Sequence, residues 1–280
     1  MEPHSVEQKA TIAGLYNRVA ATYGRVGPAV FDQFGRWLVE WTGLSTGSRV
    51  LDVGMGRGAN LFPASDIVGT HGQVVGIDLA GAMVQETAAE VRRSGRRKIT
   101  MLQMDAECLA FPDATFDGLL CGFTLFFMLH PQQALAEWYR VVRPGGRVGV
   151  SVAGTGDERW QWYEALLQSF HQIYHFSLNP GGGGLRRPSE IEAALTAAGF
   201  VNIQVMTTTH EFVYANEAEW WRAKWTHGAR YPLERMSPEV LDQFKAEVLA
   251  RLEPLKEADG FHEQWQLVCL LGRKPEQTAE

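Results

Sequence analysis

The sequence predicts a doubly wound α/β fold built on a mostly parallel seven-stranded sheet. Short apolar runs alternate with helical stretches from residue 49 towards the C-terminus. Helices of this length between strands form the right-handed crossovers that connect parallel strands. The second observation is a glycine-rich turn directly after the first apolar run, in residues 50–60 (VLDVGMGRGAN). Open α/β sheets bind their ligands at turns of this kind, so the ligand site is expected there.

The strands are identified as short apolar runs bounded by turn residues or helical stretches. They are expected at residues 49–53, 73–77, 99–103, 116–121, 147–153, 201–208 and 265–271. One helical stretch begins near residue 57. Further helical stretches cover residues 81–93, 132–142, 157–177, 188–198 and 238–252. Pro188 and Ser189 suit the start of the fifth of these helices.

We expect a single domain with helical additions. Residues 1–45 form an N-terminal helical cap, 46–154 a ligand-binding core, and 155–187 and 209–262 two helical insertions. The insertions follow the carboxyl ends of later strands, where open α/β sheets bind ligands, so they are predicted to form a lid. Residues 179–184 (NPGGGG), before Arg186 and Arg187, are interpreted as a linker, with an anion site as the alternative.

Composition restricts the class of protein. Of the 280 residues, 45% are hydrophobic and 21% charged, which is typical of a globular chain. The net charge is −6, and the one dense basic cluster, residues 92–98, lies where a helix should end, so no nucleic-acid partner is expected. There is no signal-peptide layout and no apolar run of membrane-spanning length. The three cysteines lie far apart, which argues for a cytoplasmic protein without a thiolate metal site.

The glycine turn distinguishes between two cofactor classes. Gly54, Gly56 and Gly58 follow the spacing G-x-G-x-G, whereas dinucleotide enzymes use G-x-G-x-x-G. The Asp52 carboxylate would repel a pyrophosphate and attract the ammonium group of a ligand that carries an amino acid. Turn glycines without any ligand are the alternative interpretation.

Two acids follow at the ends of later strands. Asp78 is placed to accept both ribose hydroxyls of an adenosine, and Asp105 to accept its amino group. The alternatives are a helix N-cap for Asp78 and an ordinary loop carboxylate for Asp105.

With these residues, the chain resembles a class I S-adenosylmethionine-dependent methyltransferase of the small-molecule type. The motifs are residues 51–58 (LDVGMGRG), 111–117 (FPDATFD) and 140–146 (RVVRPGG), with 16–23 (YNRVAATY) similar to the segment that closes over the cofactor. The resemblance implies S-adenosylmethionine as cofactor, without a metal ion, held by Tyr23, Asp52, Gly54, Gly56, Gly58, Asp78, Leu79, Met83, Asp105, Ala106, Gly122 and Phe123. The sequence departs from many relatives after the fourth strand, where residues 121–128 (CGFTLFFM) line the entrance with aromatic groups.

The first insertion supplies the candidates for catalysis. On a helical projection Glu164, His171 and His175 share one edge beside a broad apolar arc. Glu164 or His171 is therefore the candidate base, although a surface role is the alternative for both. An acceptor is expected to contact Tyr16, Phe127, Trp160, Tyr163, His175 and Trp221.

The predicted activity is methyl transfer to oxygen or carbon of a small, largely apolar metabolite, as in quinone or secondary metabolism. The nine tryptophans favour a flat or hydrophobic acceptor. Three alternatives stay open. The first is C-methylation of an isoprenoid alkene through a carbocation, with a diphosphate as the possible anchor. The others are a homologue that binds the cofactor without methylating and a nicotinamide-dependent oxidoreductase. Whether the chain forms a homo-oligomer is also left open.

Overall fold

The computed structural model describes residues 3–178, 180 and 184–276. Its seven-stranded sheet has the strand order β3-β2-β1-β4-β5-β7-β6. The strands are β1 (Arg49–Val53), β2 (Gln73–Asp78), β3 (Ile99–Gln103), β4 (Phe116–Gly122), β5 (Val142–Ala153), β6 (Val201–Tyr214) and β7 (Phe261–Arg273). All neighbouring pairs are parallel except those that β7 makes with β5 and β6. The predicted α/β sheet is confirmed, and it is mixed.

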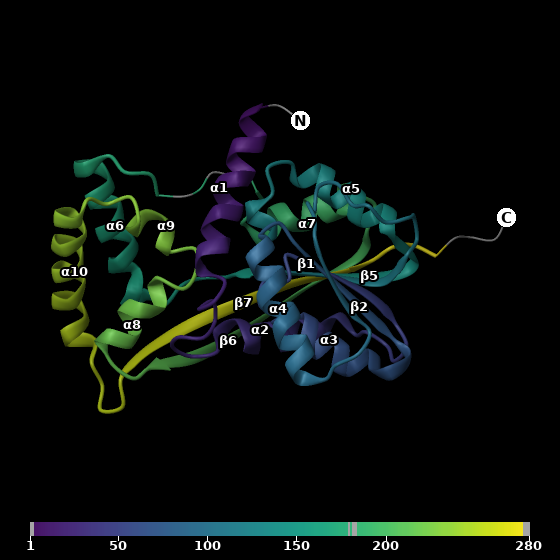
Figure 1. The fold of residues 1–280 in the computed structure, drawn as a ribbon, viewed down its shortest axis with the longest axis horizontal. Coiled ribbons are helices and arrows are strands. Elements are labelled where there is room, and N and C mark those ends of the chain that lie inside the picture. Colours follow the sequence, from purple (N-terminus) through teal and green to yellow (C-terminus); the bar gives the residue numbers. More distant parts are fainter. Residues whose placement is uncertain (1–2, 179, 181–183, 277–280) are drawn as a thin grey trace.

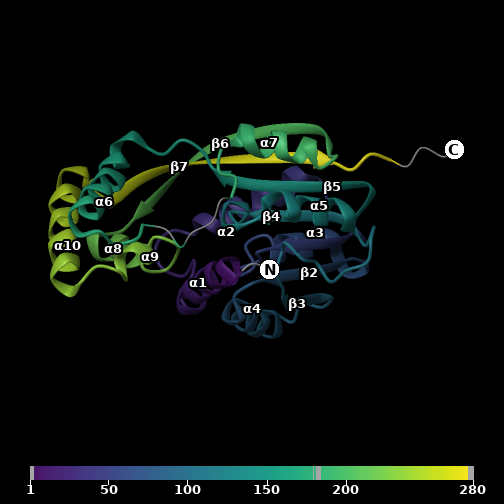
Figure 2. The same ribbon diagram turned by 90° about the horizontal axis from the view of Figure 1, so that it is seen from above.

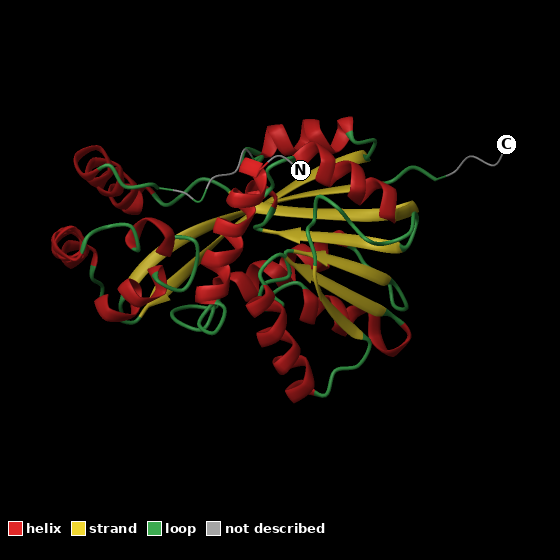
Figure 3. Ribbon diagram, turned by 45° about the horizontal axis from the view of Figure 1, so that its top comes forward, coloured by secondary structure: helices red, strands yellow, loops and turns green. Residues whose placement is uncertain are grey.

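Helices cover both faces of the sheet (Figure 3). They are α2 (Val30–Thr42), α3 (Leu61–Val68), α4 (Gly81–Ser94), α5 (Pro131–Val141) and α7 (Pro188–Ala197), whereas α1 (Pro3–Val19) packs against α4. Leu51 on β1 packs in the core that α5 and α7 cover, whereas Val50 packs in the core that α2 and α3 cover. Successive side chains of a strand point to opposite faces, so β1 is apolar on both.

A lid of further helices lies at one end of the sheet (Figures 1 and 2). It contains α6 (Gln161–Tyr174), α8 (Glu217–Lys224), α9 (Arg230–Leu233) and α10 (Pro238–Leu252). Trp160, Trp220 and Phe244 are central members of its hydrophobic core. Residues 181–183 of the predicted linker lie outside the described part of the chain.

The hairpin of β6 and β7 is longer than the sequence predicts. The two strands stay paired from Val201 with Arg273 to Tyr214 with Phe261, so the second insertion covers residues 215–260 rather than 209–262. The outer part of β6 alternates buried Phe212 and Tyr214 with exposed positions, so it has a strand pattern without a continuous apolar run.

Other predicted boundaries were also wrong, including those of the helix expected at residues 157–177, which is α6. Helix α3 begins at Leu61, whereas the sequence predicts a start near residue 57. Gly58 closes a turn before it by donating its N–H to the Met55 carbonyl at 2.8 Å. β5 begins at Val142, since the predicted turn before it belongs to the strand. Within the described residues, no helix combines the length and apolar character that crossing a bilayer requires.

His262, at the start of β7, gives a testable pH effect on stability. Its Nε2 lies 2.8 Å from Asp259 Oδ1 and its Nδ1 lies 3.0 Å from Glu211 Oε2; these hydrogen bonds raise the pKa of His262 to about 9. Because the pKa of His262 is higher in the folded state than in the unfolded state, protonated His262 contributes its full stabilisation below about pH 6.5. This contribution is lost as the pH rises towards 9. We expect the melting-temperature advantage of the wild type over His262→Gln to disappear across this window. A constant difference from pH 6 to 10 would contradict the assignment.

Candidate active site

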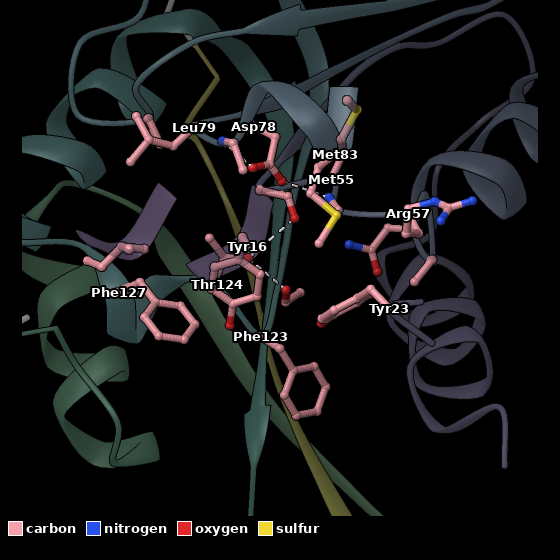
Figure 4. A pocket seen from close by; sticks show the side chains of 18 of the residues that line it. Tyr16, Tyr23, Met55, Arg57, Asp78, Leu79, Met83, Phe123, Thr124 and Phe127 are labelled. Carbon is pink, nitrogen blue, oxygen red and sulfur yellow. Dashed lines mark hydrogen bonds between the residues drawn. The ribbon is translucent and has the colours of Figure 1, made fainter. Parts of the chain in front are cut away.

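A pocket lies at the carboxyl ends of β1, β2 and β4, and α1 covers it. Its walls come from the glycine turn, from the residues after β2, β3 and β4, and from one face of α1. Figure 4 shows Asp78 and Met83 towards one end and Phe123 and Phe127 towards the other. The structure therefore brings together most of the residues that the resemblance implies for the cofactor.

The glycine turn leaves a space at the floor of the pocket. Gly54 and Gly56 have φ values of +65° and +50°, which only glycine adopts readily. A Cβ at Gly54 would lie 2.3 Å from Cγ2 of Thr124, so this glycine permits close packing of the β1 and β4 ends. A Cβ at Gly56 would project into open space, with Tyr23 Cε1 nearest at 3.8 Å. Gly56 is thus the position where a ligand can approach the backbone.

Asp78 stands at the centre of this arrangement. Its Oδ2 accepts a hydrogen bond from Gly56 N at 2.9 Å, and its Oδ1 accepts one from Ala80 N at 2.8 Å. Burial raises the pKa of Asp78 to about 6. The carboxylate is therefore fixed against the glycine turn and is ionised at neutral pH, ready to accept from ligand hydroxyls.

Asp52 and Gly58 do not line the pocket, contrary to their predicted roles. Asp52 is fully buried, and Asn60, which does line the pocket, donates from Nδ2 to Asp52 Oδ1 at 3.0 Å. Asp52 Oδ2 has no hydrogen-bond partner within the described residues, and burial raises the pKa of Asp52 to about 7. Asn60, rather than Asp52, thus faces the pocket. Gly58 serves the turn before α3.

Lys9 links α1 to the acids after β3. Its Nζ lies 2.6 Å from Asp105 Oδ2 and 2.6 Å from Glu107 Oε2. Glu107 is 1% exposed and accepts a further hydrogen bond from Leu129 N at 2.6 Å. The ammonium group thus pairs with two neighbouring carboxylates, offsets one of their two negative charges, and fixes the helix over the pocket.

We expect Lys9→Met to weaken cofactor binding about 10-fold, because the two carboxylates would repel each other and α1 would lose its anchor. Isothermal titration with S-adenosylhomocysteine measures this. Lys98→Met, which changes a lysine outside the pocket lining, is the control and should bind as the wild type does. Equal affinities for both variants would show that Lys9 does not hold α1 over the pocket.

Aromatic side chains form the other side of the pocket. Tyr16 packs edge-on against Phe127, with ring centres 5.3 Å apart, and Tyr23 stacks on Phe31 at 5.1 Å. Phe31 in turn meets Phe123 edge-on at 5.7 Å. Burial raises the pKa of both tyrosines, so they remain neutral. The five rings define an aromatic wall: Tyr16, Tyr23, Phe31, Phe123 and Phe127.

The candidates from the first insertion lie elsewhere. Glu164 is exposed and accepts from Gln168 Nε2 at 3.2 Å, while the His171 ring contacts the carbonyl of Phe176. Neither belongs to the pocket lining, so the prediction of a base on α6 gains no support. The reason is packing: α6 turns Leu166 and Phe170 into the lid core, which leaves its polar edge to solvent.

The acceptor contacts predicted from the insertions do not line the pocket either. Trp160, Tyr163 and Trp221 belong to the lid core or pack against it. His175 is an exposed residue with φ +56° that ends α6. Only Tyr16 and Phe127 among the predicted acceptor contacts line the pocket.

Sequence reasoning missed other pocket residues. Lys9, Phe31, Asn60 and Thr124 line it, and none has a motif of its own. His227, in the loop between α8 and α9, was also missed; it does not line the pocket, but its ring centre lies 6.3 Å from that of Phe31, which does. The one nearby signal in the sequence, the aromatic residues after β4, indicates none of these positions directly.

Known proteins show the same combination of fold and motifs. A family model described as a methyltransferase domain matches residues 51–150. An aklanonic acid methyltransferase from Streptomyces sp. strain C5 is 38% identical over 148 residues, which cover 53% of this chain and 66% of that protein. A ubiquinone/menaquinone biosynthesis C-methyltransferase from Pseudomonas fluorescens is 33% identical, with 64% of this chain and 70% of that protein covered. A nocamycin O-methyltransferase from Saccharothrix syringae is 28% identical, with 85% and 89% covered.

Solved structures share the fold. The [4+2]-cyclase SpnF superposes with a TM-score of 0.57 at 23% identity, covering 97% of this chain and 95% of that chain. A Haemonchus contortus phosphoethanolamine N-methyltransferase in complex with S-adenosyl-L-methionine gives a TM-score of 0.55 at 20% identity, covering 94% and 57%.

The pocket of this chain fits the cofactor that these enzymes use. The space above Gly56 admits a ligand where a side chain would stand, and the ionised Asp78 beside it offers a paired acceptor for vicinal hydroxyls. Asp105 and the aromatic wall border the same cavity. The chain therefore belongs to the class I S-adenosylmethionine-dependent methyltransferases and uses S-adenosylmethionine as its cofactor.

Proposed function

We propose that this enzyme methylates an oxygen or a carbon of a small, flat, largely apolar metabolite of the quinone or secondary-metabolite type. The observation that carries the proposal is the aromatic wall, which borders the same pocket as Asp78 and the glycine turn. Aromatic rings bind flat apolar molecules by stacking and edge contacts. The relatives named above, an aklanonic acid methyltransferase, a nocamycin O-methyltransferase and a ubiquinone/menaquinone biosynthesis C-methyltransferase, support the same acceptor class.

The pocket-lining residues divide into a set that holds the cofactor and a set that holds the acceptor. Gly54, Gly56, Asp78, Leu79, Met83, Asp105, Ala106, Gly122 and Tyr23 hold the cofactor, and Tyr16, Phe31, Phe123 and Phe127 hold the acceptor. When bound, S-adenosylmethionine supplies a methyl group activated by its cationic sulfur. The protein then has to align the acceptor and exclude water, and such alignment can lower a barrier by about 7–11 kcal/mol. Helix α1, fixed through Lys9, covers the pocket for this purpose.

Transfer of a labelled methyl group tests the proposal. The purified enzyme is incubated with methyl-labelled S-adenosylmethionine and a panel of naphthols, naphthoic acids, hydroxyanthraquinones and prenyl alcohols. We expect label in the flat aromatic acceptors, and mass spectrometry locates the new methyl. Labelling of prenyl compounds alone, or binding of cofactor with no transfer to any member, would overturn it.

A further inference from the structure

The loop between α8 and α9 places a polar side chain, His227, beside a ring that lines the apolar pocket. His227 packs edge-on against Phe31 of the aromatic wall. The next residue, Gly228, lies against the same wall: a Cβ there would be 3.5 Å from Tyr16 Oη and 4.0 Å from Phe127 Cζ. His227 therefore stands beside the rings proposed to hold the acceptor, although it is distant from them in sequence.

The hydrogen bonding of His227 fixes the position of its proton. The backbone N–H of Ala229 donates to His227 Nδ1 at 3.3 Å. A nitrogen that accepts from an amide carries no proton, so the proton of the neutral ring is on Nε2. Within the described residues, no protein group is hydrogen-bonded to Nε2. His227 thus offers a donor beside the pocket, and Nε2 is not available as a base.

A buried positive charge lies close to this donor. Lys224, three residues earlier, is 6% exposed, and its Nζ stands 4.2 Å from the centre of the Trp220 ring. Its nearest carboxylate oxygen, Glu263 Oε2, is 3.8 Å away, too far for a hydrogen bond. Burial and the charge of Lys224 lower the pKa of His227 to about 3, so His227 stays neutral. Burial lowers the pKa of Lys224 as well, and in its charged form Lys224, partly offset by Glu263, adds a positive potential at His227.

From this geometry we infer that the acceptor binds as an anion, a carboxylate or an ionised phenol or enol, whose oxygen accepts a hydrogen bond from His227 Nε2. The inference rests on the proposed function and makes it more specific. An ionised oxygen contributes the electron pair of the new O–C bond, and the pair of the broken S–C bond remains on sulfur. No proton has to be removed, which agrees with a histidine placed as a donor.

Binding to the enzyme saturated with S-adenosylhomocysteine tests the inference without turnover. The probes are 2-naphthoic acid and its amide, 2-naphthamide, which have nearly the same shape and differ in charge. By calorimetry at pH 7.5 we expect the acid to bind at least about 10-fold more tightly, the effect of one charge-assisted hydrogen bond. His227→Leu should remove this preference, and His227→Gln, whose amide N–H can reach the position of Nε2, should retain most of it. The affinity for S-adenosylhomocysteine should be unchanged in both variants.

The results of this binding experiment distinguish a failure of the inference from a failure of the proposed function. If acid and amide bind equally to the wild type, or if His227→Leu retains the preference, the inference is wrong while the proposed function stands. If neither naphthyl compound binds to an enzyme that binds S-adenosylhomocysteine, the flat acceptor and the inference fail together. A loss of S-adenosylhomocysteine binding in His227→Leu would show that this histidine supports the fold of the pocket and would also overturn its assigned role.

Discussion

Replacement of Asp78 by asparagine is expected to weaken the binding of S-adenosylmethionine by at least about 100-fold. The carboxylate is held by Gly56 N and Ala80 N, and its charge strengthens each hydrogen bond that it accepts from a ribose hydroxyl. An amide offers one acceptor atom and no charge. Calorimetric titration measures the loss, and Asp66→Asn, at an exposed acid on α3, is the matched control.

The same substitution should change the pH dependence of binding. Because burial raises the pKa of Asp78 to about 6, the wild type should lose affinity as the pH falls from 7 to 5 and the carboxylate is protonated. In Asp78→Asn this component should be absent. A wild-type affinity that is constant from pH 5 to 8 would contradict the role of an ionised Asp78.

Replacement of Trp220 by alanine is expected to lower the free energy of unfolding by about 3–5 kcal/mol, as removal of large buried aromatic side chains does. Trp220 is 1% exposed, stacks on Trp160 at 5.5 Å and lies under the Lys224 ammonium group. It thereby connects α8 to the first insertion. Urea denaturation measures the loss, and Tyr174→Ala, at a 42% exposed aromatic residue of the same lid, should cost far less.

The functional effect of Trp220→Ala should be confined to the acceptor. The residues proposed to hold the cofactor lie at the sheet ends, on α4 and in the segment after α1, whereas α8 precedes the loop with His227. We therefore expect S-adenosylhomocysteine binding to persist at a temperature where the variant is folded, with methyl transfer reduced. Equal losses of both would show that the lid core also supports the cofactor site.

The sequence was sufficient to predict the sheet and much of the cofactor site because both depend on local patterns. The apolar runs mark β1 to β4 to within a residue, and the spacing of Gly54, Gly56 and Asp78 follows from one turn and the next strand end. Asp52 shows the limit of that reasoning. Its place in the motif is visible in sequence, but whether it touches the ligand depends on Asn60, which folds back over it.

Contacts between distant segments could not be predicted in this way. Lys9 and Asp105 are 96 residues apart, and neither belongs to a pattern that indicates the other. The helical projection of α6 correctly separates apolar from polar positions near Leu166 and Phe170. It cannot tell whether a polar edge faces a cavity or solvent, and α6 turns Glu164 to solvent. His227 lies in a short loop without periodicity, so only the folded chain reveals its neighbour Phe31.

A crystal structure of the complex with S-adenosylhomocysteine tests the central claim most directly. We expect the ribose hydroxyls to lie within hydrogen-bond distance of the Asp78 carboxylate and the nucleoside to lie between the glycine turn and Asp105. The sulfur should be directed towards the aromatic wall. A nucleoside bound away from Asp78, or a sulfur separated from Tyr16 and Phe127 by the protein backbone, would contradict it.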